Sequence, residues 1–241
     1  MAKIEVTSVG VQFSATTNKR KFFPSILKTK TEPTAPSRSV IENITFSLSD
    51  GDKVGLLGRN GAGKTTILRV LAQILKPTIG EVYIEGEVGA LFGAIPFMNP
   101  TLSARRNMVN YLAVAGIVGD QAKELISDVE EFIEIGEYFD MPIQIYSSGM
   151  LAKFNFSLLT AFDKEILLLD EGIGAGDFFF SQKINTRLDR LYSSAKILVM
   201  ASHSNDMIKQ LCNKCIILSA GKIVKVGNVD ECLDTYITGV F

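Results

Sequence analysis

The sequence has few of the features that would place it in a disulfide-rich, membrane-spanning or nucleic-acid-binding class. Its three cysteines are an odd number, which argues against a disulfide framework. No stretch reaches the roughly 18 apolar residues of a membrane-spanning helix; residues 112–118 form one of the longest apolar runs. The formal net charge of −1 provides no overall attraction to nucleic acid or to a membrane surface.

Two further absences concern the N-terminus and the cysteine spacing. Lys3 and Glu5 lie where the apolar core of a signal peptide would be needed, so we expect the chain to stay in the cytoplasm. Cys212 and Cys215 form a C-x-x-C pair without a second pair, which leaves a metal or redox centre short of ligands. We expect these cysteines to mark a helix end that enters a buried strand.

What the sequence does contain is a glycine-rich stretch that fits the phosphate-binding pattern G-x-x-x-x-G-K-[ST]. An apolar run at 54–57 precedes it as a short buried strand, and residues 65–72 follow it with helical spacing. Glycines allow a tight turn whose N–H groups approach phosphate oxygens, and the next helix directs its positive end toward them. The residues expected at the nucleotide are Gly58, Arg59, Asn60, Gly61, Ala62, Gly63, Lys64, Thr65 and Thr66.

Within this pattern Lys64 can reach the β- and γ-phosphates of a nucleotide, and the Thr65 hydroxyl can ligate Mg²⁺. The loop alone leaves open whether the enzyme is an ATPase, a GTPase or a kinase.

Carboxylates and the single histidine follow two later strands. Asp170 and Glu171 end the apolar run at 166–169, where Mg²⁺ and an attacking water must be held. We expect Asp170 to bind the metal and Glu171 to act as the base that orients the water. His203 lies just past a strand at 196–201 and can donate a hydrogen bond to a γ-phosphate.

The periodicity predicts an α/β fold: a P-loop nucleotide-binding core with an antiparallel β subdomain and an inserted helical subdomain, all in one domain over residues 1–241. Alternating residues predict strands at 3–13, 40–48 and 81–86, and the helix after the loop should stop near Pro77. A helical lobe should span about 95–162, with a first helix capped by Thr101 or Ser103 and running to Val118. The remaining expected elements are helices at 121–135, 149–162 and 178–191, strands at 215–219 and 222–226, and a short terminal helix.

Residues 18–38 interrupt the strand pattern with three prolines and a lopsided charge. The segment reads either as a solvated loop or as a contact with anionic lipid headgroups or a membrane partner. Its charged residues are Lys19, Arg20, Lys21, Lys28, Lys30, Glu32 and Arg38.

Between the two nucleotide motifs, Tyr146-Ser147-Ser148-Gly149-Met150 opens a predicted helix. This order of motifs resembles the ATP-binding cassette (ABC) ATPases over nearly the whole chain. In that family a Ser-Gly signature at a helix N-terminus binds the γ-phosphate of ATP held by the opposite subunit. The resemblance therefore implies that Ser147, Ser148 and Gly149 act on the nucleotide of a second copy, in a homodimer.

The details resemble one branch of that family, the ATPase subunits that export bacterial surface polysaccharides. The usual signature is Leu-Ser-Gly-Gly-Gln, whereas this chain has Tyr-Ser-Ser-Gly-Met. The Gly176-Asp177 pair, the insert before Val40 and the closing segment from 211 to 236 also look like theirs.

This resemblance implies ATP hydrolysis, with ATP and Mg²⁺ as cofactors, that drives export of a lipid-linked polysaccharide of the O-antigen, capsule or teichoic acid type. Export would pass through a separate transmembrane permease subunit, with the ATPase on the cytoplasmic face of the bacterial inner membrane. The alternative is a soluble cassette ATPase acting on nucleic acid or the ribosome. A single phosphate loop, the short distance between motifs and the net charge of −1 argue against it. A kinase would leave Ser148 and Gly149 unexplained, and import instead of export stays open.

Two family positions have no clear counterpart. No glutamine lies between Gln73 and Gln121, where many cassette ATPases have one that senses Mg²⁺ and water, so the sensing residue is open. For the aromatic that stacks on adenine we select Phe13, which follows the first strand, with Phe22 and Phe23 as competitors. Core packing is the alternative role for Phe13.

Overall fold

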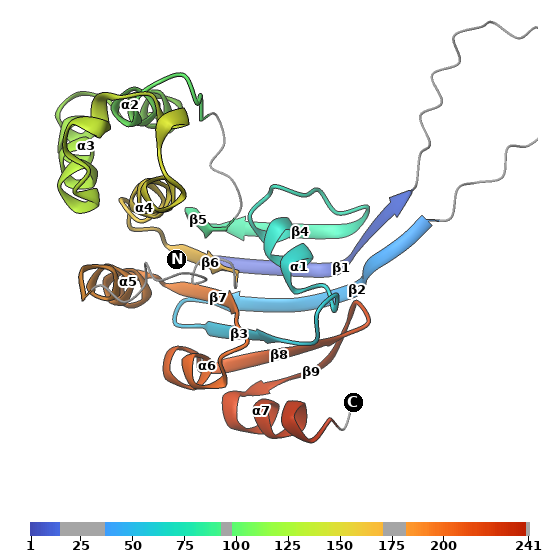
Figure 1. Cartoon of the computed structure of the whole chain (residues 1–241). Helices are drawn as coiled ribbons and strands as arrows, with labels where there is room; N and C mark the ends of the chain where they lie inside the picture. The colour runs from blue at the N-terminus through green and yellow to red at the C-terminus, as the bar shows by residue number, and fades with distance from the viewer. Residues whose placement is uncertain (15–36, 93–97, 171–181, 240–241) are drawn as a thin grey trace, which may run out of the picture.

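The computed structural model describes residues 1–14, 37–92, 98–170 and 182–239 (Figure 1). A three-stranded antiparallel sheet has the order β2-β1-β4. Its strands are β1 (Lys3–Ser14), β2 (Ser37–Ser49) and β4 (Ile79–Glu85). The alternating pattern predicted all three, but β2 begins at Ser37 and not at Val40, because Arg38 pairs with Phe13 at the far end of β1. Of the basic insert, residues 18–36 lie outside the described residues.

The second sheet has the strand order β5-β6-β7-β3-β8-β9, in which β9 is antiparallel to β8 and the other neighbours are parallel. The strands are β3 (Lys53–Leu57), β5 (Val88–Leu91), β6 (Ile166–Leu169), β7 (Ile197–Ala201), β8 (Lys214–Ser219) and β9 (Lys222–Asn228). Strand β5 was not predicted, since four residues that include a glycine carry little strand signal.

The elements stack in layers (Figure 1). Helix α1 (Lys64–Leu71) packs between the two sheets, where its Ile67 and Leu68 join a core shared with β1, β2 and the parallel strands. Alternate residues of β6 face opposite sides: Leu168 joins that core, and Leu167 packs against α5 (Gln182–Ser194). On this second side, α6 (Asn205–Leu211) and α7 (Val229–Thr238) cover β3 and β8. The period-two alternation therefore gives each central strand two buried faces.

Helix α1 ends earlier than predicted. It stops at Leu71 and not near Pro77. Gln73 adopts a left-handed backbone with φ of 57°, which a continuing helix does not allow. The N–H groups of Ile74 and Leu75 both donate to the carbonyl oxygen of Arg69, which ends the regular pattern. Pro77 therefore follows the end of α1 and does not cause it.

The helical lobe consists of α4 and four helices that precede it in the chain. They are α2 (Ala104–Val114), α3 (Gly119–Ile133) and the 3₁₀ helices η1 (Gly136–Asp140) and η2 (Ile143–Ile145); α4 spans Ser148–Leu159. They share a core of their own around Phe139 and Phe154, separate from the core of the sheets. The helices of the lobe therefore pack against one another around their own apolar core.

The boundaries of α2 and α5 differ from those predicted. Ser103, and not Thr101, is the N-cap of α2, and α2 stops at Val114 before Gly116, whose φ is 76°. Helix α5 continues past Leu191 to Ser194; residues 178–181 of its predicted start lie outside the described residues.

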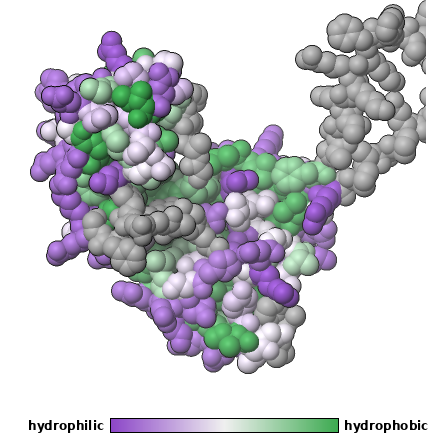
Figure 2. Space-filling model, viewed as in Figure 1, coloured by the Kyte–Doolittle hydropathy of each residue, from purple (hydrophilic) through white to green (hydrophobic). Residues whose placement is uncertain are grey.

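Hydrophilic side chains cover much of the face in Figure 2, with hydrophobic patches on the helical lobe and along the antiparallel sheet. Exposed apolar residues include Val114 and Val118 in the lobe and Phe13 and Ile79 in the sheet. Within the described ranges, no helix combines the length and the apolar character needed to cross a membrane.

Candidate functional site

The C-terminal ends of three neighbouring parallel strands bring most of the predicted site residues to one edge of the sheet (Figure 1). Strand β7 lies between β6 and β3, and Met200 and Ala201 pair with Leu169 and Leu56 respectively. Because neighbouring strands lie about 4.8 Å apart, the chain leaves β3 and β6 within roughly 10 Å of one another. The loop after β3, Asp170 after β6 and His203 after β7 therefore share this edge.

The loop itself is held tightly from two sides. Gly58 has φ of 154°, and a Cβ there would lie 2.5 Å from the carbonyl oxygen of Leu218 in β8. Gly63 has φ of 108°, and a Cβ there would lie 2.5 Å from Cγ2 of Ile41 in β2. A side chain at either position would force the loop off these strands.

The turn between β8 and β9 supports the same loop. The N–H of Gly221 donates to the carbonyl oxygen of Ala62 at 3.2 Å, and its own carbonyl accepts from the N–H of Glu42 at 2.8 Å. Gly221 lies in the short connection between the strands predicted at 215–219 and 222–226. Its contribution to the loop depends on residues distant in the chain and has no local sequence signal.

Lys64 is buried at the first turn of α1, and its Nζ donates to the carbonyl oxygen of Gly58 at 2.6 Å. Arg59, Asn60 and Gly61 are exposed on the loop, whereas Ala62 and Gly63 are buried. Thr65 and Thr66, in the first turn, are half-buried. The ammonium therefore lies over the loop whose N–H groups are expected to meet phosphates.

The N-terminus of α1 differs in its capping from those of α2, α4, α6 and α7. Its N-cap Gly63 makes no side-chain cap hydrogen bond, and its first turn contains no acidic residue. In α2, α4, α6 and α7 a serine or asparagine side chain accepts a hydrogen bond from the first turn. The positive end of α1 is thus left to an external anion, so the loop fits a phosphate group.

Asp170 is half-buried directly after β6, and His203 is exposed two residues after β7. Within the part of the chain that the structure describes, no cluster of three or more His, Cys, Asp or Glu side chains could hold a metal ion. Mg²⁺ needs only one or two protein ligands when phosphates and waters complete its shell. The pair Thr65 and Asp170 fits that requirement. Glu171 lies outside the described residues.

The signature residues lie on a different element, at the N-terminus of α4 in the helical lobe. Ser147 is the N-cap, and its hydroxyl accepts a hydrogen bond from the N–H of Met150 at 3.2 Å. Ser148 and Gly149 are exposed, and a Cβ at Gly149 would meet only the Ser147 hydroxyl, 4.0 Å away. The N-terminus of α4 is therefore accessible to another molecule. The prediction that the signature lies at the start of a helix is confirmed.

Phe13 lies near the end of β1, and 51% of its surface is exposed. It is therefore not a core residue, which removes the alternative role considered from the sequence. Phe22 and Phe23 lie outside the described residues.

The cysteines occupy structural positions, as expected. Cys212 follows the end of α6 and Cys215 is buried in β8, and both are free thiols. Burial raises the pKa of each thiol to about 12. Such thiols are protonated at neutral pH and are poor metal ligands.

Comparison with known proteins identifies the family. The model of the ABC transporter family matches residues 41–174. The chain belongs to the ABC transporter family. The matched segment of this ABC ATPase runs from β2 through the loop, the signature and Asp170, whereas Phe13 and His203 lie outside it.

Among curated relatives, this ABC ATPase is 40% identical to an O-antigen export system ATP-binding protein of Yersinia enterocolitica, over 77% of each chain. It is 32% identical to an O-antigen export system ATP-binding protein of Klebsiella pneumoniae, over 81% of this chain and 80% of that one. A teichoic acids export ATP-binding protein of Lactococcus lactis is 33% identical over 81% of this chain and 42% of its own length.

Solved structures share the fold. An ATP-binding subunit of an ABC transporter superimposes with a TM-score of 0.72 at 16% identity, covering 98% of both chains. A dimeric ATP-binding cassette in a post-hydrolysis state bound to ADP and Pi superimposes with a TM-score of 0.68 at 20% identity, covering 94% of this chain and 98% of that one. The expected α/β cassette fold is confirmed.

Proposed function

We propose that this ABC ATPase hydrolyses ATP to drive export of a lipid-linked bacterial surface polysaccharide through a separate transmembrane permease. The observation that carries the substrate class is the 40% identity, over 77% of each chain, to a protein named for O-antigen export. Teichoic acid export proteins are similar over 81% of this chain. O-antigen, capsule and teichoic acid are all polysaccharide-type polymers, so the proposal stops at that class.

In this proposal the described residues divide the work between binding and positioning. The loop from Gly58 to Gly63 and the positive end of α1 receive the phosphates, and Lys64 places its ammonium beside them. Phe13, half-exposed at the end of β1, offers a ring surface for adenine. His203, two residues after β7, donates a hydrogen bond toward the γ-phosphate.

Thr65 and Asp170 would hold Mg²⁺ at this edge. When bound, the ion would neutralise charge on the phosphates that the loop receives. Glu171, assigned from the sequence, orients and deprotonates the attacking water.

In this proposal the signature residues act on the nucleotide of a second copy of the chain. Ser147, Ser148 and Gly149 lie on α4 and not on the sheet edge that holds Lys64 and Asp170. In a homodimer related by a two-fold axis, the signature end of each α4 would complete the site of the other subunit. We place this dimer on the cytoplasmic face of the bacterial inner membrane, bound to the permease.

The test begins with the genes that flank the gene for this chain, among which we expect a membrane subunit and glycosyltransferases. The chain is then reconstituted with that membrane subunit. Vesicles containing the complex receive either the lipid-linked polysaccharide that the expected glycosyltransferases make or the same glycan freed from its lipid. We expect the lipid-linked form alone to stimulate ATP hydrolysis. Equal rates with both forms, or stimulation only by an unrelated small solute, would refute polysaccharide export.

A further inference from the structure

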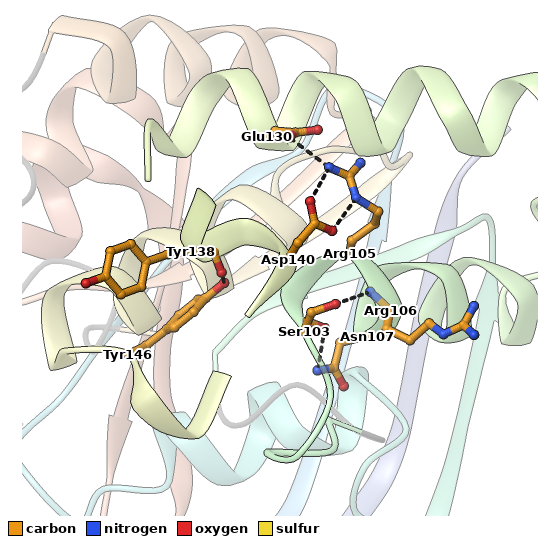
Figure 3. Close-up of polar contacts among 8 residues, drawn as sticks. All are labelled: Ser103, Arg105, Arg106, Asn107, Glu130, Tyr138, Asp140 and Tyr146. Atoms are coloured by element: carbon orange, nitrogen blue, oxygen red, sulfur yellow. Dashed lines mark hydrogen bonds and ion pairs between the residues drawn. The ribbon is translucent and has the colours of Figure 1, made fainter. Parts of the chain in front are cut away.

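Tyr146 is the first residue of the signature and is bonded to another part of the helical lobe (Figure 3). Its hydroxyl donates to the backbone carbonyl oxygen of Tyr138 in η1 at 2.7 Å. Burial raises the pKa of Tyr146 to about 12, so the hydroxyl stays protonated and able to donate near neutral pH. The next residue, Ser147, is the N-cap of α4. The position of the signature is therefore linked to the position of η1.

Arg105 fixes η1 in turn (Figure 3). Its Nε lies 2.7 Å from Oδ1 of Asp140 and one terminal nitrogen lies 3.1 Å from Oδ2, a two-bond contact with the last residue of η1. The same terminal nitrogen donates to Glu130 of α3 at 2.8 Å. The guanidinium also lies 4.8 Å from the centre of the fully buried Phe139 ring. A single side chain thus connects α2, α3 and η1.

The backbone just before Tyr146 is fixed from another side. The N–H of Ile143 donates to the carbonyl oxygen of Leu102, and the N–H of Gln144 donates to that of Pro100, each at 3.0 Å. The amide of Asn107, which is 2% exposed, donates to the carbonyl oxygens of Leu102 and Ser103. Segments 100–103 and 142–144 therefore form one hydrogen-bonded unit, and the chain leaves it at Tyr146.

We infer that Tyr146 is a positioning residue: its hydroxyl, anchored on η1, sets where Ser147, Ser148 and Gly149 present the N-terminus of α4. This inference rests on the proposed action of the signature on the ATP of a second copy. The hydroxyl lies within the lobe and away from the phosphate loop. Its loss should therefore slow hydrolysis without weakening the binding of nucleotide to Lys64 and its loop.

The test compares Tyr146→Phe with a matched control, Ser157→Ala, in the full chain. Tyr146→Phe keeps the ring and removes only the hydroxyl. Ser157 is fully buried on the same helix, and its hydroxyl also donates to a backbone carbonyl, that of Lys153 at 2.7 Å, away from the signature. Both variants lose one hydroxyl-to-carbonyl hydrogen bond in the lobe, but only the first loses it beside Ser147.

Three quantities are measured for each variant: the affinity of the isolated chain for a fluorescent ATP analogue, the kcat for ATP in complex with the membrane subunit, and the Tm. Because one hydrogen bond is lost, we expect Tyr146→Phe to lower kcat by about 2- to 10-fold. Its affinity for the analogue should stay within about twofold of that of the unaltered chain, as expected for an intact phosphate loop. Ser157→Ala should keep its kcat even where its Tm falls equally.

Unchanged kcat in Tyr146→Phe would overturn the inference. So would an equal loss of kcat in Ser157→Ala, because general softening of the lobe would then explain both. The unaltered chain is measured first. If it does not hydrolyse ATP in the complex, the proposed function fails, and this result is distinct from a failure of the inference about Tyr146.

Discussion

The ammonium of Lys64 lies 2.6 Å from the carbonyl oxygen of Gly58, the first residue of the loop that precedes its own helix. The side chain therefore turns back across the loop and does not extend along α1. This geometry places a buried cation beside the backbone N–H groups that face a phosphate in the proposed site. A positive charge held there should strengthen the binding of a nucleotide through its phosphates.

We expect Lys64→Met to weaken ATP binding by about 10- to 100-fold, the loss of one charge-assisted contact to phosphate. Methionine fills a similar volume and buries no charge, so the Tm should change little. Equilibrium titration with a fluorescent ATP analogue measures the first effect and thermal unfolding the second. Binding within about twofold of that of the unaltered chain would show that Lys64 does not contact the phosphates.

We expect Glu171→Gln to bind ATP and to hydrolyse it about 10²- to 10⁴-fold more slowly, because the amide keeps the shape and loses the base. Single-turnover hydrolysis at saturating ATP measures the rate. Glu165→Gln is the matched control, since Glu165 lies just before β6 and Glu171 just after it. If both variants were slowed to a similar degree, the cause would be a disturbance of β6 and not the loss of a catalytic base.

The shared site predicts complementation between two inactive chains. Lys64→Met removes the phosphate contact, and Ser148→Arg places a bulky cation at the N-terminus of α4. A heterodimer of the two variants contains one interface with both defects and one with neither. We expect it to recover at most about half of the normal ATPase rate with the membrane subunit present.

Differently tagged variants, purified through both tags, allow that rate to be measured. Strict cooperation between the two sites would also keep the heterodimer inactive. Glu171→Gln separates the cases, because it should accumulate an ATP-dependent dimer on size-exclusion chromatography. Absence of both the rescue and that dimer would refute the shared site.

The ion pair between Arg105 and Asp140 predicts a pH dependence of stability. Arg105 lowers the pKa of Asp140 in the folded chain. A lowered folded pKa stabilises the protein above the unfolded pKa of about 3.9 and loses that stabilisation as the pH falls through the folded value. Urea unfolding between about pH 6 and pH 3 should therefore show a decline that is shallower in Asp140→Asn. Parallel curves would show that this pair does not contribute.

The raised pKa values of the Cys212 and Cys215 thiols predict slow thiol chemistry. Because burial raises the pKa of Cys212 and Cys215 to about 12, almost no thiolate exists at pH 8. We expect a thiol-specific reagent to label the native chain slowly and all three cysteines rapidly in urea. Fast labelling of the native protein, or zinc that copurifies in proportion to the chain, would contradict a purely structural role.

How far the sequence predicts the site depends on the range of the contacts involved. The loop could be read directly, because Gly58, Gly63 and Lys64 are specified by a short pattern that reflects backbone freedom and charge. Asp170 and His203 could be placed at one sheet edge, because each follows an apolar strand and parallel strands end on the same side. Strand β5 and the early end of α1 were missed, since a short strand and a left-handed Gln73 have weak local signals.

The sequence by itself determined the family, the order of the motifs and most of the elements, because hydrophobic period and glycine requirement are properties of neighbouring residues. Only the tertiary structure decided what surrounds them. Residue 58 must be a glycine because the backbone of Leu218 leaves no room for a side chain there. The hydroxyl of Tyr146 donates to Tyr138 in η1, which Arg105 contacts through Asp140. These contacts arise when separately formed elements pack, and no local pattern encodes which partners packing brings together.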